Sequence, residues 1–292
     1  FMIQWGRVHR DLGFGPVPQH DRVGFLDALD HGDVVAFGDA ISPPPRSLLR
    51  SVPAGTPPSP PAFAKHMKAI MGDPKAARAA VVPVNKETCA RWKAAANTGL
   101  PEGKFVSTDD IVTARTWQAL CAIRCAQLGI PKDSQDVETT CARAWNFRLR
   151  TTPPLGAQYF GNATGNVHTQ MKVGALLAMA PAEVALALRA SLQACSSQDV
   201  AARGKWMRAQ HAEGATAKMP WDENAMTFVV SSWNFPWESV RFLGDTAPFC
   251  FDHGAIVPVV AVFVPRAQQD GLNVYVSGPD DACLEMFVSE AF

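Results

Sequence analysis

The chain has 292 residues, with 27 basic and 27 acidic side chains and a formal net charge of zero. Basic and acidic residues are interspersed, which argues against a protein that binds nucleic acid or an acidic membrane surface. No apolar run approaches the roughly 20 residues that cross a bilayer. We therefore expect a soluble globular protein without a transmembrane segment, long enough for two domains or for one domain plus a large remnant.

The seven cysteines are odd in number and contain no Cys-x-x-Cys pair. Cys121 and Cys125 are four residues apart in a helical pattern, so they share one helix face. No nearby histidine or cysteine pair completes a metal site, and we expect buried thiols and no bound metal. The pattern is typical of a reducing compartment, which predicts an intracellular, cytoplasmic location and leaves an organelle open.

The N-terminal part begins with an apolar alternation typical of a strand at residues 1–9, followed by a helical pattern over residues 20–33. The opening Phe-Met-Ile-Gln-Trp-Gly reads as the interior of a strand, so we expect the natural chain to begin further upstream or to be processed. Residues 42–61 are dense in proline, which favours an extended surface connection. The predicted organisation is a domain remnant (1–41), a linker (42–78) and a second domain (79–292).

The second domain mixes helices and strands without strict alternation, which predicts a mixed-sheet α/β fold. Asn85 is the expected N-cap of one helix, and Ser107 or Thr108 caps the next, which stops at Gly129. Strands are expected at 145–152, 226–233, 254–265 and 271–278, and helices at 180–195 and 279–287.

Five stretches, in this order along the chain, resemble the BAHD acyltransferases, and one of them, residues 104–124, resembles the trichothecene O-acetyltransferase branch in particular. They are PPPRSLL (43–49), KFVSTDDIVTARTWQALCAIR (104–124), NFRLRTTPPLGAQYFGNATGN (146–166), VVSSWNFPW (229–237) and DGLNVYVSGPDDACLEMF (270–287). The resemblance implies two similar α/β domains with the active site in a channel between them. It implies a coenzyme A-dependent acyltransferase fold of which this chain carries the complete second domain and a remnant of the first.

The family's first motif, His-x-x-x-Asp-Gly, is altered here. If Gly13-Phe14-Gly15 is aligned with the Gly-Phe-Gly after the family's aspartate, Leu12 takes the aspartate position and Val8 the histidine position. His9 then lies one residue late, on the opposite face of an extended chain. His9 and Asp11 share a face, however, and a local bulge would re-aim both, so they are the candidate general base and its orienting acid. His20, in a second partial motif, is a weaker alternative.

The second motif, Asp-Phe-Gly-Trp-Gly in the family, is replaced by RFLGDTAP (241–248), in which Arg241 stands where the acid is expected. Asp245 is the candidate substitute from a shifted position. The resemblance also implies that Arg148 or Arg150 is the structural arginine that pairs with the first motif's aspartate. With Leu12 in that place, its partner would be Asp11, Asp245 or solvent.

The resemblance implies an acyl-CoA co-substrate and no metal. Ser231, Ser232 and Trp233 belong to the strand that borders the coenzyme A tunnel in the family. Ser107 and Thr108 are either helix caps alone or a helix N-terminus that faces a phosphate.

Two functions stay open at this stage. The first is transfer of an acyl group from acyl-CoA to the hydroxyl or amine of a small-molecule acceptor. The second is a non-catalytic family member that serves as a binding or assembly subunit, with a protein partner or the missing N-terminal half. Neither involves nucleic acid.

Overall fold

The structure is a computed structural model that describes residues 50–53, 78–152, 154–155, 159, 162–218, 226–233, 240–242, 245–248, 260–266, 271–278 and 281–291. The predicted strand over residues 1–9, the predicted helix over residues 20–33 and the candidates His9, Asp11 and His20 lie outside these residues. The described strands are β1 (Arg50–Pro53), β2 (Arg78–Asn85), β3 (Glu138–Asn146), β4 (Thr164–Lys172), β5 (Ala215–Lys218), β6 (Thr227–Ser232), β7 (Val260–Pro265) and β8 (Gly271–Gly278). The described helices are α4 (Lys86–Asn97), α5 (Thr108–Leu128), α6 (Val173–Ala178), α7 (Pro181–Gln193), α8 (Ser197–Ala212) and α9 (Asp281–Ala291).

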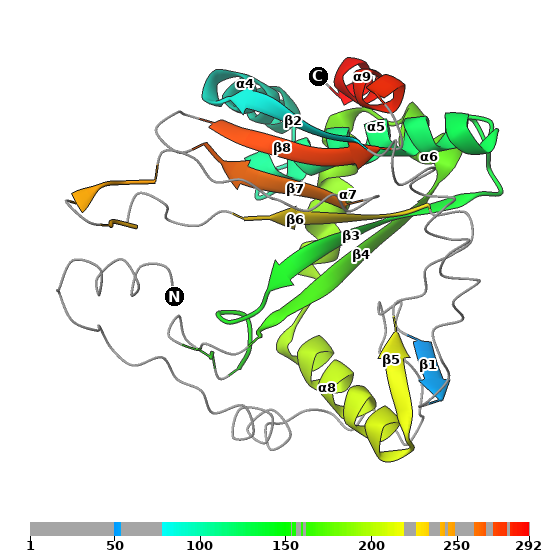
Figure 1. Cartoon of the computed structure of the whole chain (residues 1–292), viewed down its shortest axis with the longest axis vertical. Helices are drawn as coiled ribbons and strands as arrows, with labels where there is room; N and C mark the ends of the chain where they lie inside the picture. The colour runs from blue at the N-terminus through cyan, green and yellow to red at the C-terminus, as the bar shows by residue number, and fades with distance from the viewer. Residues whose placement is uncertain are drawn as a thin grey trace.

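Six of these strands form one mixed sheet in the order β2-β8-β7-β6-β3-β4. Strands β7, β6 and β3 run parallel to one another, whereas β8 pairs antiparallel with both β2 and β7, and β4 pairs antiparallel with β3. Helices α4, α5, α6 and α9 lie along one side of this sheet (Figure 1). The predicted mixed-sheet α/β fold is therefore confirmed.

Helix α5 is the centre of the core. It packs against α4, α7 and α9, and buried residues follow one another almost all round it from Asp110 to Cys125. Residues next to its two ends determine where α5 begins and where it ends. The Ser107 side chain accepts a hydrogen bond from the Asp110 N–H in a capping box, and Gly129 ends the helix in the left-handed conformation with φ of 67°. The predicted cap at Asn85 of α4 is also confirmed, with its Oδ1 2.7 Å from the Thr88 nitrogen.

The strand predicted at residues 145–152 is wrong in its position. Strand β3 begins at Glu138 and ends at Asn146. A turn follows, in which the Arg150 N–H donates to the Phe147 carbonyl and the Arg148 N–H donates to Asn146 Oδ1. The Asn146 side chain thus accepts a hydrogen bond from the backbone two residues later, which stabilises a turn at the end of the strand.

Two further regions differ from expectation. Strand β4, helix α6 and helix α8 have no counterpart among the predicted elements. Within the proline-rich connection, the four residues of β1 pair antiparallel with β5 in a separate two-stranded sheet. Among the described helices, none is long and apolar enough to span a membrane.

Candidate functional site

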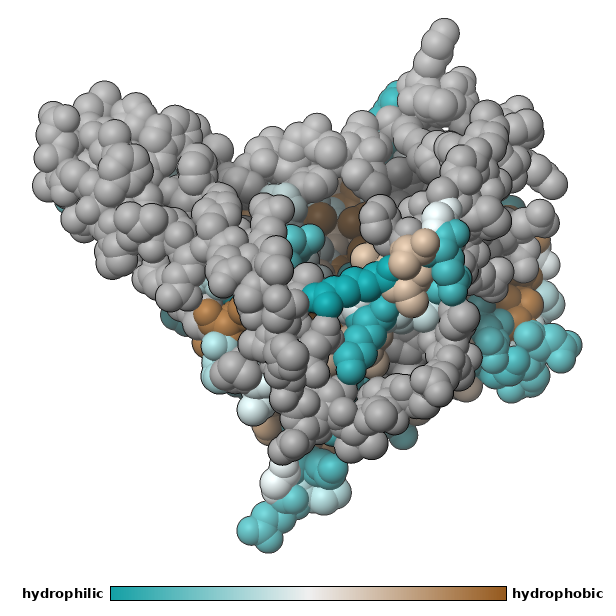
Figure 2. Space-filling model, turned by 90° about the horizontal axis from the view of Figure 1, so that it is seen from below, coloured by the Kyte–Doolittle hydropathy of each residue, from teal (hydrophilic) through white to brown (hydrophobic). Residues whose placement is uncertain are grey.

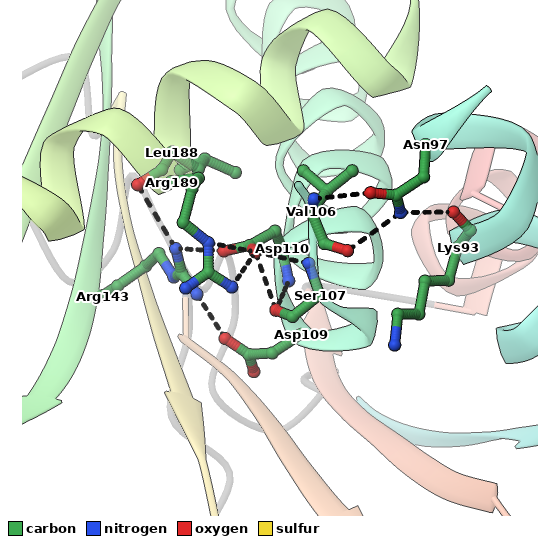
Figure 3. A network of polar contacts seen from close by, with 9 residues as sticks. All are labelled: Lys93, Asn97, Val106, Ser107, Asp109, Asp110, Arg143, Leu188 and Arg189. Atoms are coloured by element: carbon green, nitrogen blue, oxygen red, sulfur yellow. Dashed lines mark hydrogen bonds and ion pairs between the residues drawn. The ribbon is translucent and has the colours of Figure 1, made fainter. Parts of the chain in front are cut away.

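A network of buried polar contacts lies where α5 begins (Figure 3). Asp110 is fully buried, and its Oδ2 accepts hydrogen bonds from the Ser107 hydroxyl at 2.7 Å and the Ser107 N–H at 2.8 Å. The same oxygen accepts from Arg189 Nε on α7 at 2.8 Å, and Arg189 Nη2 contacts it as well. The second oxygen, Oδ1, accepts from Arg143 Nη1 on β3 at 3.0 Å. One carboxylate therefore joins a helix cap, a neighbouring helix and the sheet.

Arg143 is the buried cation of this network. It contacts Asp110, the Asp109 carboxylate and the Leu188 carbonyl. Burial lowers the pKa of its guanidinium, but the charges of Asp109 and Asp110 raise it by more, so the net pKa lies above the ordinary value. A cation held in this way keeps its charge at any pH at which the protein folds. Arg143 therefore has a structural role, because removing one partner of a buried ion pair typically costs about 3–5 kcal/mol.

The same geometry bears on the predicted role of Ser107 and Thr108. The Ser107 hydroxyl and N–H are both engaged by Asp110, and two carboxylates already stand at the positive end of the helix dipole. A phosphate at this terminus would have to approach those two carboxylates. Helix capping by Ser107 is confirmed, and phosphate binding by Ser107 or Thr108 stays a prediction.

Strand β6 carries the donor-site candidates Ser231 and Ser232 on opposite faces of the sheet. Phe228 and Val230 belong to the core cluster shared with the helices. Alternation along β6 therefore places Ser231 on the opposite side of the sheet and Ser232 on the helix side. Trp233 lies two residues after Ser231, donates from Nε1 to the Ser231 Oγ at 2.9 Å, and packs with a second cluster made of Val262, Val264 and Tyr275.

We call the side of the sheet that carries Ser231, opposite the described helices α4, α5, α6 and α9, the open face; the name marks this side only, and Thr140, Ala142, Val262, Val264 and Tyr275 on it are buried. Its alternate residues include Thr140, Ala142, Ala144, Asn166, His168, Gln170, Val229, Ser231, Val262, Val264 and Tyr275, with Trp233. The registers Ala142↔His168 and Ala144↔Asn166 put polar residues of β4 beside small residues of β3. Gln170 Nε2 donates to Thr140 Oγ1 at 3.3 Å on the same face. His168 lies in the middle of β4. Seen from the side away from α4 and α9, hydrophilic residues lie at the middle of the molecule, with hydrophobic ones visible deeper in a hollow (Figure 2).

The two arginines predicted to be structural lie in the turn after β3. Arg148 Nε donates to the Tyr159 carbonyl at 3.0 Å and Nη1 donates to Asn146 Oδ1 at 3.2 Å. Arg150 is exposed. The motif residues proposed as their partners near residue 12 lie outside the described residues, so that pairing stays a prediction.

Asp245 lies in a tight turn with φ of 61°, where its N–H donates to the Phe242 carbonyl at 3.0 Å. Its side chain is exposed, whereas Arg241 is half-buried and donates from Nη1 to the carbonyl of Val240. The proposed substitution of Asp245 for the family's acid stays a prediction.

The paired cysteines of α5 are buried, as predicted. Burial raises the pKa of the Cys121 thiol to about 12, and burial raises the pKa of the Cys125 thiol as well. Neutral thiols are poor metal ligands. Within the described part of the chain, no group of three or more His, Cys, Asp or Glu side chains is arranged to hold a metal.

The structure therefore brings together Ser231 and Trp233 on the open face, and separates them from Ser107 at the cap of α5. Sequence reasoning missed the network of Asp109, Asp110, Arg143 and Arg189. One signal was present: an arginine in the otherwise apolar and small-residue run Cys-Ala-Arg-Ala-Trp needs a buried partner.

Comparison with known proteins gives one family match. The family model described as "Transferase family" matches residues 83–289, which include every described strand of the six-stranded sheet at least in part. No curated protein matches the chain significantly.

Solved structures with a similar fold include F. sporotrichioides TRI101, crystallised with coenzyme A and T-2. Its TM-score is 0.60 at 20% identity, over 74% of this chain and 49% of that one. Apo F. graminearum TRI101 has a TM-score of 0.61 at 18% identity, over 99% of this chain and 63% of that one. Vinorine synthase has a TM-score of 0.54 at 14% identity, over 74% of this chain and 48% of that one. The chain thus spans about half to two thirds of the length of these proteins.

Proposed function

Because the chain belongs to the Transferase family, that of the BAHD-type acyltransferases, we propose that it transfers an acyl group from acyl-CoA to a hydroxyl or amine of a small molecule. The observation that carries the proposal is the family match over residues 83–289. The folds of TRI101, crystallised with coenzyme A, and of vinorine synthase agree with it.

The open face is the proposed wall of the donor site. It is the side of the sheet that carries Ser231 and Trp233, and the described helices α4, α5, α6 and α9 lie on the other side (Figure 1). The Trp233 N–H bond to Ser231 Oγ and its backbone N–H bond to the Phe263 carbonyl hold this end of β6 in place. A rigid strand end with a hydroxyl acceptor and an indole suits the amide-rich pantetheine arm of coenzyme A, which alternates polar and apolar groups.

In the proposed reaction, the imidazole of His9 removes the proton from the acceptor hydroxyl or amine. The acceptor atom attacks the thioester carbonyl carbon and forms a C–O or C–N bond while the negative charge moves to the carbonyl oxygen. The C–S bond then breaks, and the coenzyme A thiolate takes the proton from the imidazolium. Asp11 is proposed to orient His9, and Arg148 or Arg150 to hold the first motif's loop.

A turnover experiment tests the proposal. Release of free coenzyme A from acetyl-CoA would be followed with a panel of alcohols and amines, in the native chain and in His9→Ala. Acceptor-dependent thiol release that falls at least a hundredfold in His9→Ala supports the mechanism, since general-base catalysis contributes roughly 10²–10⁴-fold. Release that is unchanged in His9→Ala removes His9 from the mechanism and leaves the family activity to another base.

A second function is favoured by one observation, the alteration of both motifs. Val8 and Leu12 stand at the positions of the family's histidine and aspartate, and Arg241 at that of the second motif's acid. Loss of all three polar groups with retention of a packed second domain suits a non-catalytic subunit. Absence of turnover together with co-purification in a complex of fixed stoichiometry would favour this second function.

A further inference from the structure

The proline-rich connection is attached to the second domain at one described place. Strand β1, inside residues 42–61, pairs antiparallel with β5, from Arg50↔Lys218 to Pro53↔Ala215. The pair lies beside α8 and away from the six-stranded sheet (Figure 1). A two-stranded sheet is at best marginally stable by itself in water. The pair therefore requires a packed support.

Helix α8 is that support. It leads into β5 through Gly214, whose φ of 69° reverses the chain, and β5 contacts α8. Helix α8 buries a set of side chains despite its polar sequence, namely Ala201, Ala202, Trp206 and Gln210.

Helix α8 is in turn fixed to the edge of the main sheet. Arg203 Nη2 donates to the carbonyl of Asn166 on β4 at 3.2 Å. A Cβ on Gly165 would lie 2.5 Å from Arg203 Nη1, so the glycine makes room for the guanidinium over the strand. At the first residue of α8, the Ser197 hydroxyl accepts a hydrogen bond from the Thr152 N–H at 2.9 Å. A continuous series of contacts thus runs from β1 through β5 and α8 to β4.

We propose that β5 is a docking strand that anchors the connecting segment on α8. The ladder fixes the connecting segment at Arg50–Pro53 against β5, and β5 in turn contacts α8. This inference holds whether or not the chain is an enzyme.

Trypsin cleavage tests the anchor with native residues. The Arg50–Ser51 bond lies inside the ladder, and the Arg46–Ser47 bond outside it is the internal reference. The double variant Thr216→Pro with Ala217→Pro removes two consecutive N–H groups of β5, and one of any two such groups points to the partner strand. We expect cleavage at Arg50 to be at least tenfold faster in this variant than in the native chain, with cleavage at Arg46 unchanged.

The matched control is Thr216→Val with Ala217→Val, which keeps both N–H groups and favours a strand. It should be cleaved at Arg50 as slowly as the native chain. Hydrogen exchange of the native chain gives a second measurement. If the proline variant fails to fold, this measurement by itself tests the anchor. Slowing of the Ser51 or Val52 amide at least tenfold below the unstructured rate supports the anchor. Fast exchange of both amides, or equal cleavage at Arg50 in native and proline variants, would overturn it.

Discussion

Arg143 on β3 and Asp110 on α5, 33 residues apart in the chain, form a buried ion pair at 3.0 Å. Asp110 is also the N3 residue of the capping box that begins α5. The carboxylate that starts the central helix is therefore the one that fixes this helix to the sheet. The pair therefore favours one register of α5 against the sheet, together with the apolar contacts of the same helix.

Removing one member of the pair should be strongly destabilising. Arg143→Met leaves the fully buried Asp110 with a lost partner, and we expect the free energy of unfolding to fall by about 3–5 kcal/mol. Urea unfolding monitored by tryptophan fluorescence measures it. The control is Lys172→Ala, which breaks the exposed pair with Glu138 at 3.2 Å and should cost less than about 1 kcal/mol. Equal losses in the two variants would contradict the role given to Arg143.

Ser107→Ala separates helix capping from phosphate binding. Loss of the hydroxyl that caps α5 should lower the free energy of unfolding by about 1 kcal/mol. If capping is the whole role, the affinity for coenzyme A stays as in the native chain. An affinity at least tenfold lower, with a smaller loss of stability, would instead assign Ser107 to the donor site.

Because of its buried thiols, the protein should have a free energy of unfolding that depends on pH in the alkaline range. Burial raises the pKa of both Cys121 and Cys141 from an ordinary value of 9.0 to about 12. Between these values the unfolded chain loses the thiol protons and the folded chain keeps them, so the free energy of unfolding should fall as pH rises from 9 towards 12. Cys121→Ala with Cys141→Ala should flatten this dependence in urea unfolding at pH 8.5–10.5. An unchanged slope would show that the two thiols are not protected in the folded state.

A side chain at Gly165 would displace the guanidinium of Arg203. Gly165→Ala places a Cβ 2.5 Å from Arg203 Nη1, the far end of a flexible side chain, so we expect a loss of about 1 kcal/mol, as for the loss of the hydrogen bond from Arg203 to the Asn166 carbonyl. Arg203→Met in the same chain removes the colliding nitrogen. The double variant should therefore be less destabilised than the sum of the two single variants. Strict additivity in thermal or urea unfolding would mean that the two side chains do not meet.

The two neighbouring serines of β6 give a matched test of the open face. Ser231→Leu adds bulk on the open face, and Ser232→Leu adds the same bulk on the helix side. If the open face binds the donor, Ser231→Leu should weaken coenzyme A binding at least tenfold and Ser232→Leu far less. The reverse order would move the donor site to the helix side.

Local signals accounted for much of the second domain. The cap at Ser107 and the stop at Gly129 were predictable because the residues that satisfy or reverse the backbone are adjacent in sequence. Strands β6, β7 and β8 were predictable from their β-branched runs. These elements make up the centre of the sheet.

The missed features depend on tertiary contacts. Arg143 meets Asp110 through the packing of α5 on β3, which no spacing within either segment reveals. The apolar residues of helix α8 do not form a stripe along one face, and the helix contacts β5 and, through Arg203, β4. The end of β3 was misplaced because the strand was expected to run to residue 152, although the Asn146 side chain ends it earlier.

Direct binding of coenzyme A and acetyl-CoA, measured by calorimetry on the native chain, tests the central claim without knowledge of the acceptor. We expect both to bind in the micromolar range, with Ser231→Leu at least tenfold weaker. No binding to a chain shown to be folded by cooperative urea unfolding would contradict it.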